Sequence, residues 1–184
     1  RLQRNCSLND LRKVEFEQKA VGASNEPIPF TIPVPDRIID VASVNPDFAQ
    51  SIYGDDVKWK SIEVEQISVD SYKLQRFPNE RIDLIKIDVE SYKMEVFKGM
   101  SETLKVDQPT ILVESFIDSE RAEFFDSILV SNNYFAYIFL DNGILRLDDG
   151  MQKNYDGLNF LFSSRRSSKL FTSYKETISF VSEV

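Results

Sequence analysis

The order of apolar and polar positions along the chain predicts alternating strands and helices. An apolar run covers residues 82–89, apolar positions at helical spacing follow over 92–104, and a second apolar run covers 110–116. Strand, helix and strand in this order indicate two parallel strands joined by a helical crossover. A second amphipathic helix is expected over 120–130. This alternation predicts an α/β fold.

The amino-terminal third has a weaker pattern. Residues 1–13 are typical of the end of a helix, and the alternation over 14–21 predicts a strand ending at Gly22. Five of the seven prolines lie between 27 and 46, which predicts an extended surface loop because proline disfavours both helices and central strands. Apolar positions over 62–69 predict a strand with a bulge.

The carboxyl-terminal part predicts antiparallel strands. Residues 134–140 are aromatic and β-branched, and the turn sequence at 141–143 leads into a short apolar run at 144–147. A further strand is expected over 158–162. We therefore expect a mostly parallel sheet with an antiparallel carboxyl-terminal edge.

Composition excludes several classes of function. The net charge of -8 argues against nucleic acid as a partner, because binding to a phosphate backbone needs clustered Lys and Arg. There is no apolar run of the roughly 20 residues that a membrane span needs. A single cysteine fits a reducing compartment, so a cytoplasmic location is the default expectation. The absence of histidine leaves carboxylates, Lys and Tyr as candidates for acid–base chemistry.

One segment resembles a known family signature. The run Ile82-Asp83-Leu84-Ile85-Lys86-Ile87-Asp88-Val89-Glu90, followed by Glu95-Val96-Phe97-Lys98-Gly99, resembles the D-L-I-K-I-D-V-E-G strand and E-V-L-K-G helix of FkbM-type, S-adenosylmethionine-dependent methyltransferases. Residues 5–22, Val69-Asp70 and 109–114 are similar to further parts of that family.

The resemblance implies a Rossmann-like class I methyltransferase sheet over residues 1–162, with 163–184 as a carboxyl-terminal extension. Two positions depart from the family pattern, because Ser91 stands where the family usually has Gly and Lys93 where it often has Glu. The scattered glycines form no glycine-rich cofactor loop. The resemblance therefore implies that the amino-terminal strands are missing and that this chain alone binds the cofactor weakly and is inactive.

Three ionisable residues are candidates for the catalytic centre. Lys86, Asp88 and Glu90 share one face of the predicted strand, opposite Ile85 and Ile87, because side chains alternate along a strand. Alternation alone favours a half-exposed strand with its polar face in water. The resemblance favours a site, with Asp88 as base or orienter and Glu90 positioning the acceptor hydroxyl or the cofactor's ammonium group. Lys86 is expected to pair with one of the carboxylates, and no metal ion is assigned.

The resemblance implies that Ala20, Val21 and Gly22, together with the catalytic Asp88, bind the cofactor S-adenosyl-L-methionine, the first three on its adenine side; an ordinary strand-to-loop turn is the alternative at 20–22. Glu114, at the carboxyl end of the next strand, and Trp59, an aromatic that could stack on a sugar, are the candidates for binding the acceptor. A carboxylate at the rim of the sheet and simple packing are the alternatives for these two.

The implied function is O-methylation of a hydroxyl on a sugar, lipid or polyketide-like small molecule. The alternative is a non-catalytic remnant, or pseudoenzyme, that acts as a binding or assembly module. Without the amino-terminal strands, the edge of the strand at 82–89 would be unpaired, which predicts self-association through this edge.

Overall fold

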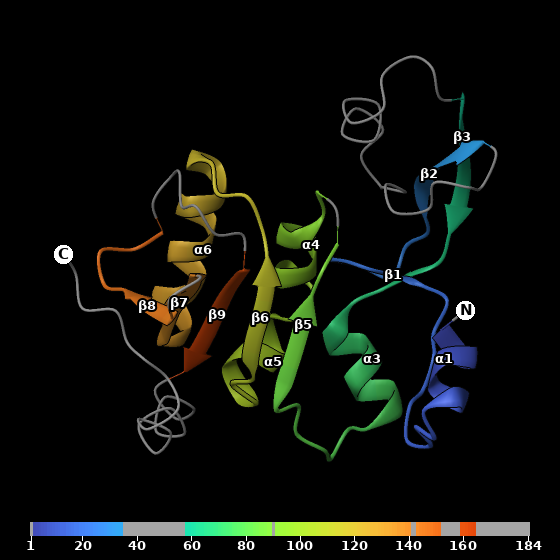
Figure 1. The fold of residues 1–184 in the computed structure, drawn as a ribbon, viewed down its shortest axis with the longest axis horizontal. Helices are drawn as coiled ribbons and strands as arrows, with labels where there is room; N and C mark the ends of the chain where they lie inside the picture. The colour runs from blue at the N-terminus through green and yellow to red at the C-terminus, as the bar shows by residue number, and fades with distance from the viewer. Residues whose placement is uncertain (1, 35–57, 90, 141–142, 152–158, 165–184) are drawn as a thin grey trace.

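The computed structural model describes residues 2–34, 58–89, 91–140, 143–151 and 159–164, arranged as helices and strands in three sheets (Figure 1). The helices are α1 (Leu2–Leu8), α3 (Val69–Arg76), α4 (Lys93–Lys98), α5 (Ser101–Val106) and α6 (Ser119–Asn132). The strands are β1 (Ala20–Val21), β2 (Ile28–Val34), β3 (Lys58–Val64), β4 (Gln66–Ile67), β5 (Leu84–Ile87), β6 (Thr110–Glu114), β7 (Tyr134–Leu140), β8 (Gly143–Leu147) and β9 (Asn159–Ser164).

The largest sheet has the strand order β5-β6-β9-β7-β8. The pair β5–β6 is parallel, as predicted, and β7–β8 is the predicted antiparallel hairpin. The expectation of a mostly parallel sheet is not confirmed, because β9 enters between β6 and β7 and is antiparallel to both. These pairings leave β5, β6 and β7 running in one direction and β9 and β8 in the other. Strand β9 also continues to Ser164, beyond the expected domain boundary at 162.

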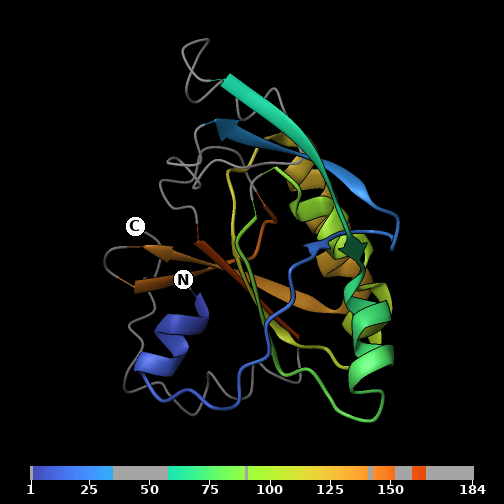
Figure 2. The same cartoon turned by 90° about the vertical axis from the view of Figure 1, so that its right-hand side faces the viewer.

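One face of this sheet carries the hydrophobic core. Figure 2 shows α4, α5 and α6 on one side of the sheet and α1, in blue, on the other. Phe97, Phe125 and Phe162 are at most 1% exposed, and the ring of Phe125 lies 5.4 Å, centroid to centroid, from each of the other two. Tilted and edge-to-face packing of this kind adds about 0.5–1.5 kcal/mol per pair to the free energy of burial. The core therefore fixes the helices against the sheet.

The helix predicted over 92–104 is two helices. They meet at Gly99, where an added Cβ would lie 1.9 Å from the carbonyl oxygen of Gly22. The Gly99 carbonyl also accepts a hydrogen bond from the Asp70 N–H at 3.0 Å. The close approach of two backbones, which only glycine allows, therefore ends α4 and directs the chain into α5.

The strand predicted over 62–69 divides between two sheets. Residues up to Val64 belong to β3, which pairs with β2, whereas β4 pairs in parallel with β1. Ser68 then begins α3, its side chain accepting a hydrogen bond from the Ser71 N–H at 3.1 Å. The change of pairing partner explains the irregular alternation that suggested a bulge. The strand predicted over 14–21 is correspondingly reduced to its last two residues.

The proline-rich stretch is a strand where it is described, rather than a loop. Strand β2 forms a two-stranded antiparallel ribbon with β3, which stands apart from the five-stranded sheet in Figure 1. Pro29 and Pro33 are tolerated because β2 pairs on one side only and residues four apart in a strand direct their backbone nitrogens to the same side. Residues 35–46 lie outside the described residues.

Candidate functional site

The carboxyl ends of β5 and β6 lie side by side and carry the candidate catalytic residues. Ile87 of β5 pairs with Val113 of β6, and both side chains point into the core, at 3% and 0% exposure. The next residues, Asp88 and Glu114, therefore point to the opposite face, as does Lys86. The predicted division of the strand into an apolar and a charged face is confirmed. Glu90 lies outside the described residues.

Lys86 and Asp88 form an ion pair on this face. The Lys86 Nζ donates to Asp88 Oδ2 at 2.5 Å, and both side chains are about half exposed. This hydrogen bond, together with the negative charges of Asp88 and Glu114, raises the pKa of Lys86 above its usual value, against a smaller opposing effect of burial. Lys86 is therefore a permanent cation beside two carboxyl groups, and the predicted pairing of Lys86 with a strand-end carboxylate is confirmed.

The turn after β5 contains both departures from the family signature. Ser91 has φ of 58°, a left-handed conformation that glycine adopts at little cost and serine does not. Lys93 donates from its Nζ to the Val89 carbonyl at 2.5 Å. The left-handed backbone at position 91 explains why the family signature has glycine there. In this chain the Lys93 ammonium group binds the carbonyl at the end of the strand, beside the strained turn.

The residues expected on the cofactor's adenine side lie next to this turn. Val21 is exposed and Ala20 half-buried, whereas Gly22 is buried. A Cβ on Gly22 would lie 2.5 Å from Gln66 Oε1 and 2.7 Å from Tyr92 Cε1. The Tyr92 hydroxyl in turn donates to Gln66 Oε1 at 3.1 Å. A side chain at position 22 would therefore have to displace the ends of Gln66 and Tyr92, and ligand contact by these residues stays a prediction.

Trp59 is placed on a different part of the molecule. It lies in β3, on the ribbon with β2, and not in the sheet that carries Asp88. Its side chain is half-buried, and its indole Nε1 has no hydrogen-bond partner among the described residues. Binding of the acceptor by Trp59 stays a prediction.

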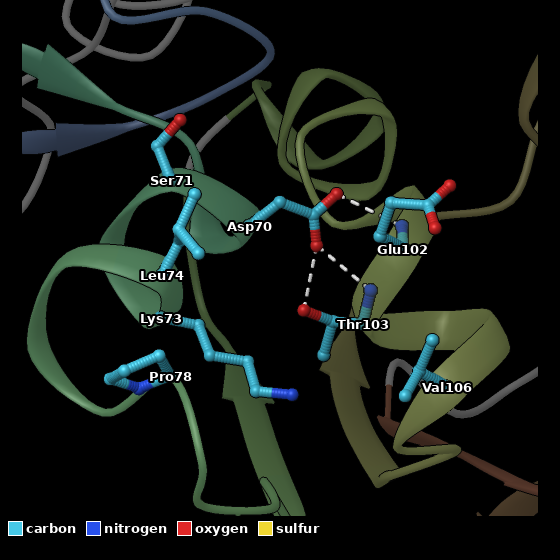
Figure 3. A pocket seen from close by; sticks show the side chains of 8 residues that line it. All are labelled: Asp70, Ser71, Lys73, Leu74, Pro78, Glu102, Thr103 and Val106. Carbon is cyan, nitrogen blue, oxygen red and sulfur yellow. Dashed lines mark hydrogen bonds between the residues drawn. The ribbon is translucent and has the colours of Figure 1, made fainter.

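Asp70 has a role that the sequence did not indicate. Its carboxylate accepts hydrogen bonds from the N–H groups of Glu102 and Thr103, at 2.9 and 2.8 Å, and from the Thr103 hydroxyl at 2.7 Å (Figure 3). The cap residue of α5, Met100, makes no such bond with its side chain. Asp70 on α3 thus caps α5, which explains the aspartate in the Val69-Asp70 motif as structural.

A groove of about 350 Å³ lies beside this cap, between α3 and α5 (Figure 3). The Lys73 ammonium group, which lies at its margin, is bound to Asp107 at 2.6 Å and is largely buried. None of the predicted catalytic, cofactor or acceptor residues lines the groove. Its lining residues are Asp70, Ser71, Lys73, Leu74, Pro78, Glu102, Thr103 and Val106.

Two residues that the sequence did not indicate lie on the same face of the sheet as Glu114. Asn159 of β9 pairs directly with Glu114, and Phe139 of β7 is next to Asn159 because the preceding pair is Ile138 with Phe160. Both Asn159 and Phe139 are exposed. Neither strand alternates apolar and polar residues, so the sequence does not single out these two positions, and the position of β9 between β6 and β7 has no local sequence signal.

Two features are absent from the described residues. No helix there is long and apolar enough to cross a membrane. No group of three or more His, Cys, Asp or Glu side chains within these ranges is placed to hold a metal ion.

Comparison with protein families connects this site to a known domain. The family model described as the methyltransferase FkbM domain matches residues 3–139, which include β5, β6 and the turn after β5. Comparison with curated proteins and with solved structures gives no match. The family model covers most of the chain, and this protein therefore belongs to the FkbM methyltransferase family.

Proposed function

We propose that this domain transfers a methyl group from S-adenosylmethionine to a hydroxyl group of a small-molecule acceptor. The supporting observation is the placement of Asp88 and Glu114 side by side at the carboxyl ends of parallel strands. Open α/β sheets bind their ligands at this position. The methyltransferase family of the chain gives the reaction class.

The residues present fit the proposed cofactor. S-adenosylmethionine supplies an electrophilic methyl group on a sulfonium and also carries an ammonium group. Asp88 is half exposed and acidic, and Glu114 lies next to it, so together they provide the negative charge that such a cation needs. Val21, which is exposed, and Ala20 would contact the adenine side of the cofactor. Gly22 is buried and packs this segment against the rest of the protein.

The chemical task of the protein is to hold the acceptor and receive its proton. The acceptor oxygen must lie in line with the methyl group, and its proton must leave as the new C–O bond forms and the C–S bond breaks. Asp88 accepts that proton, and its ion pair with the Lys86 ammonium group holds the carboxylate in place. Glu114 orients the acceptor through a second hydroxyl, with Glu90 as a further candidate.

Transfer of an isotope label tests this proposal. The full-length natural protein is incubated with S-adenosylmethionine labelled in the methyl group and with a panel of alcohols. We expect label in a product that survives mild base, since an O-methyl ether is stable where a methyl ester is hydrolysed. Label in a base-labile product would reject hydroxyl methylation, and no label with any acceptor would reject the activity.

Two observations favour a non-catalytic alternative. Asp88 is already paired with Lys86, and the strained Ser91 replaces the signature's glycine directly after the strand. A pseudoenzyme that keeps the sheet as a binding or assembly module would tolerate both. Calorimetry separates the two functions, because a module of this kind shows neither turnover nor the cofactor affinity of an enzyme in the full-length protein.

A further inference from the structure

Four side chains form a row across the face of the sheet that is opposite the helices. Glu114 pairs with Asn159, and extending the β5–β6 and β7–β9 registers by one residue places Asp88 beside Glu114 and Phe139 beside Asn159. All four belong to one face, because the residues that precede or follow them (Ile87, Val113, Phe160 and Ile138) are core residues with 0–3% exposure. Four separate parts of the sequence therefore contribute to one row.

This polar row is accessible. Asn159 is exposed, Phe139 is 37% exposed, and Asp88 is about half exposed. Lys86, paired with Asp88, offsets part of the charge of the two carboxylates. In the adjoining row of the same face, Leu161 and Tyr137 are each 7% exposed and form a buried border. The polar row is thus an accessible strip beside a buried, largely apolar part of the same face.

The chemistry of the row selects one kind of ligand. Carboxylates accept hydrogen bonds from hydroxyls, and a carboxamide both donates and accepts. An exposed phenyl ring offers a flat apolar surface to one side of a cyclic compound. An acyl chain would require a continuous apolar channel, whereas three of the four side chains in this row are polar. A ring with several hydroxyls presents both matching features, polar edges and an apolar C–H face.

We propose that the acceptor is a hydroxylated ring, a sugar or cyclitol, bound along this row. This inference rests on the proposed methyltransferase function and adds the class of acceptor and two further residues. Phe139 packs against the C–H face of the ring. Glu114 and Asn159 bind adjacent hydroxyls and leave a further hydroxyl in front of Asp88.

Binding of ring compounds, measured without cofactor, tests the assignment. Saturation-transfer NMR on the full-length protein uses methyl β-glucopyranoside and myo-inositol as hydroxylated rings, with cyclohexanol and 1-hexanol as comparison probes. The variants are Phe139→Ala, Phe139→Leu, Asn159→Ala and Asn159→Asp. Val130→Ala on α6, the helix on the other side of the sheet, and Asn79→Ala after α3 are exposed controls outside the row. Thermal melting shows that each variant is folded.

We expect the hydroxylated rings to bind with dissociation constants up to about 10 mM, as single weak ring contacts do. Phe139→Ala and Asn159→Ala should weaken them at least fivefold, Phe139→Leu and Asn159→Asp less, and the controls not at all. No binding at that concentration, equal binding of cyclohexanol, or binding unchanged in all four variants would overturn the assignment. Because no methyl transfer is measured, this outcome is independent of whether the methyltransferase function holds.

Discussion

At the scale of single residues, the turn after β5 shows how this chain tolerates a departure from its family. Ser91 adopts φ of 58°, and Lys93 donates to the carbonyl of Val89 within the same turn. A left-handed serine costs roughly 1–2 kcal/mol relative to a relaxed backbone. The strain is located directly beside the proposed catalytic strand, where family members usually carry glycine.

Replacing Ser91 by glycine should therefore stabilise the protein. The relief of backbone strain is larger than the extra chain entropy that glycine loses on folding, which costs roughly 0.5–1 kcal/mol. The free energy of unfolding is therefore expected to rise by about 0.5–1 kcal/mol. This corresponds to an increase in Tm of about 1–4 °C at this chain length. Ser127→Gly, within the regular helix α6, is the matched control and should lower Tm. A decrease in Tm for Ser91→Gly would show that the turn is not strained.

The faces of β5 are the part of the site that the sequence predicts well. A period of two separates Ile85 and Ile87 from Lys86 and Asp88, and the structure confirms it. Residues such as Asn159 and Phe139 cannot be found in this way, because their neighbours are determined by strand order over long sequence separations.

At the scale of elements, contacts between helices decide features that local patterns miss. Asp70 on α3 supplies the cap that α5 lacks, and Lys73 binds the buried Asp107, whose carboxylate also accepts from the Ile82 N–H at 2.9 Å. These bonds join α3, α5 and the approach to β5. The apolar spacing over 92–104 fits one helix, but the contact between Gly99 and Gly22 divides it.

Asp70→Ala should destabilise the protein by about 2 kcal/mol, the upper end for loss of a helix cap, because three donors on α5 lose their acceptor. Urea unfolding measures the change in free energy. Glu123→Ala, exposed on α6, should change it by less than about 0.5 kcal/mol. Equal effects of the two variants would mean that Asp70 does not hold α5.

Gly99→Ala should cost about 3 kcal/mol or more, because the new methyl group would meet the rigid backbone of Gly22 at 1.9 Å. Gly22→Ala is the matched comparison and should cost less, since its methyl group meets the movable ends of Gln66 and Tyr92. Thermal melting of both variants, or loss of soluble Gly99→Ala protein, measures this order. The reverse order would contradict the described packing of the two glycines.

At the scale of the whole molecule, the sheet has an edge at β5. Among the described strands, β5 pairs only with β6. Leu84 at the start of β5 is 65% exposed although it is apolar. An edge with unpaired backbone groups and an exposed leucine favours pairing with another chain.

The α/β class was predictable from the alternation of elements, whereas the interposed β9 that makes most pairings antiparallel was not.

Residues 1–184 expressed alone should therefore self-associate. Light scattering after size-exclusion chromatography is expected to give a mass well above that of a monomer. Leu84→Lys, which places a charge beside the edge, should shift the protein towards monomer. A monodisperse wild-type monomer with a cooperative transition near about 60 °C would show that this edge is closed.

The most direct test of the central claim is the turnover of Asp88→Asn in the full-length protein. If Asp88 receives the acceptor proton, kcat should decrease by about 10²-fold or more, while the affinity for S-adenosylmethionine falls by a much smaller factor, because the amide preserves shape and Glu114 keeps its negative charge. Glu123→Ala serves as the surface control and should retain full turnover. A decrease in kcat of less than about threefold would contradict the account and leave Asp88 as only the ion-pair partner of Lys86.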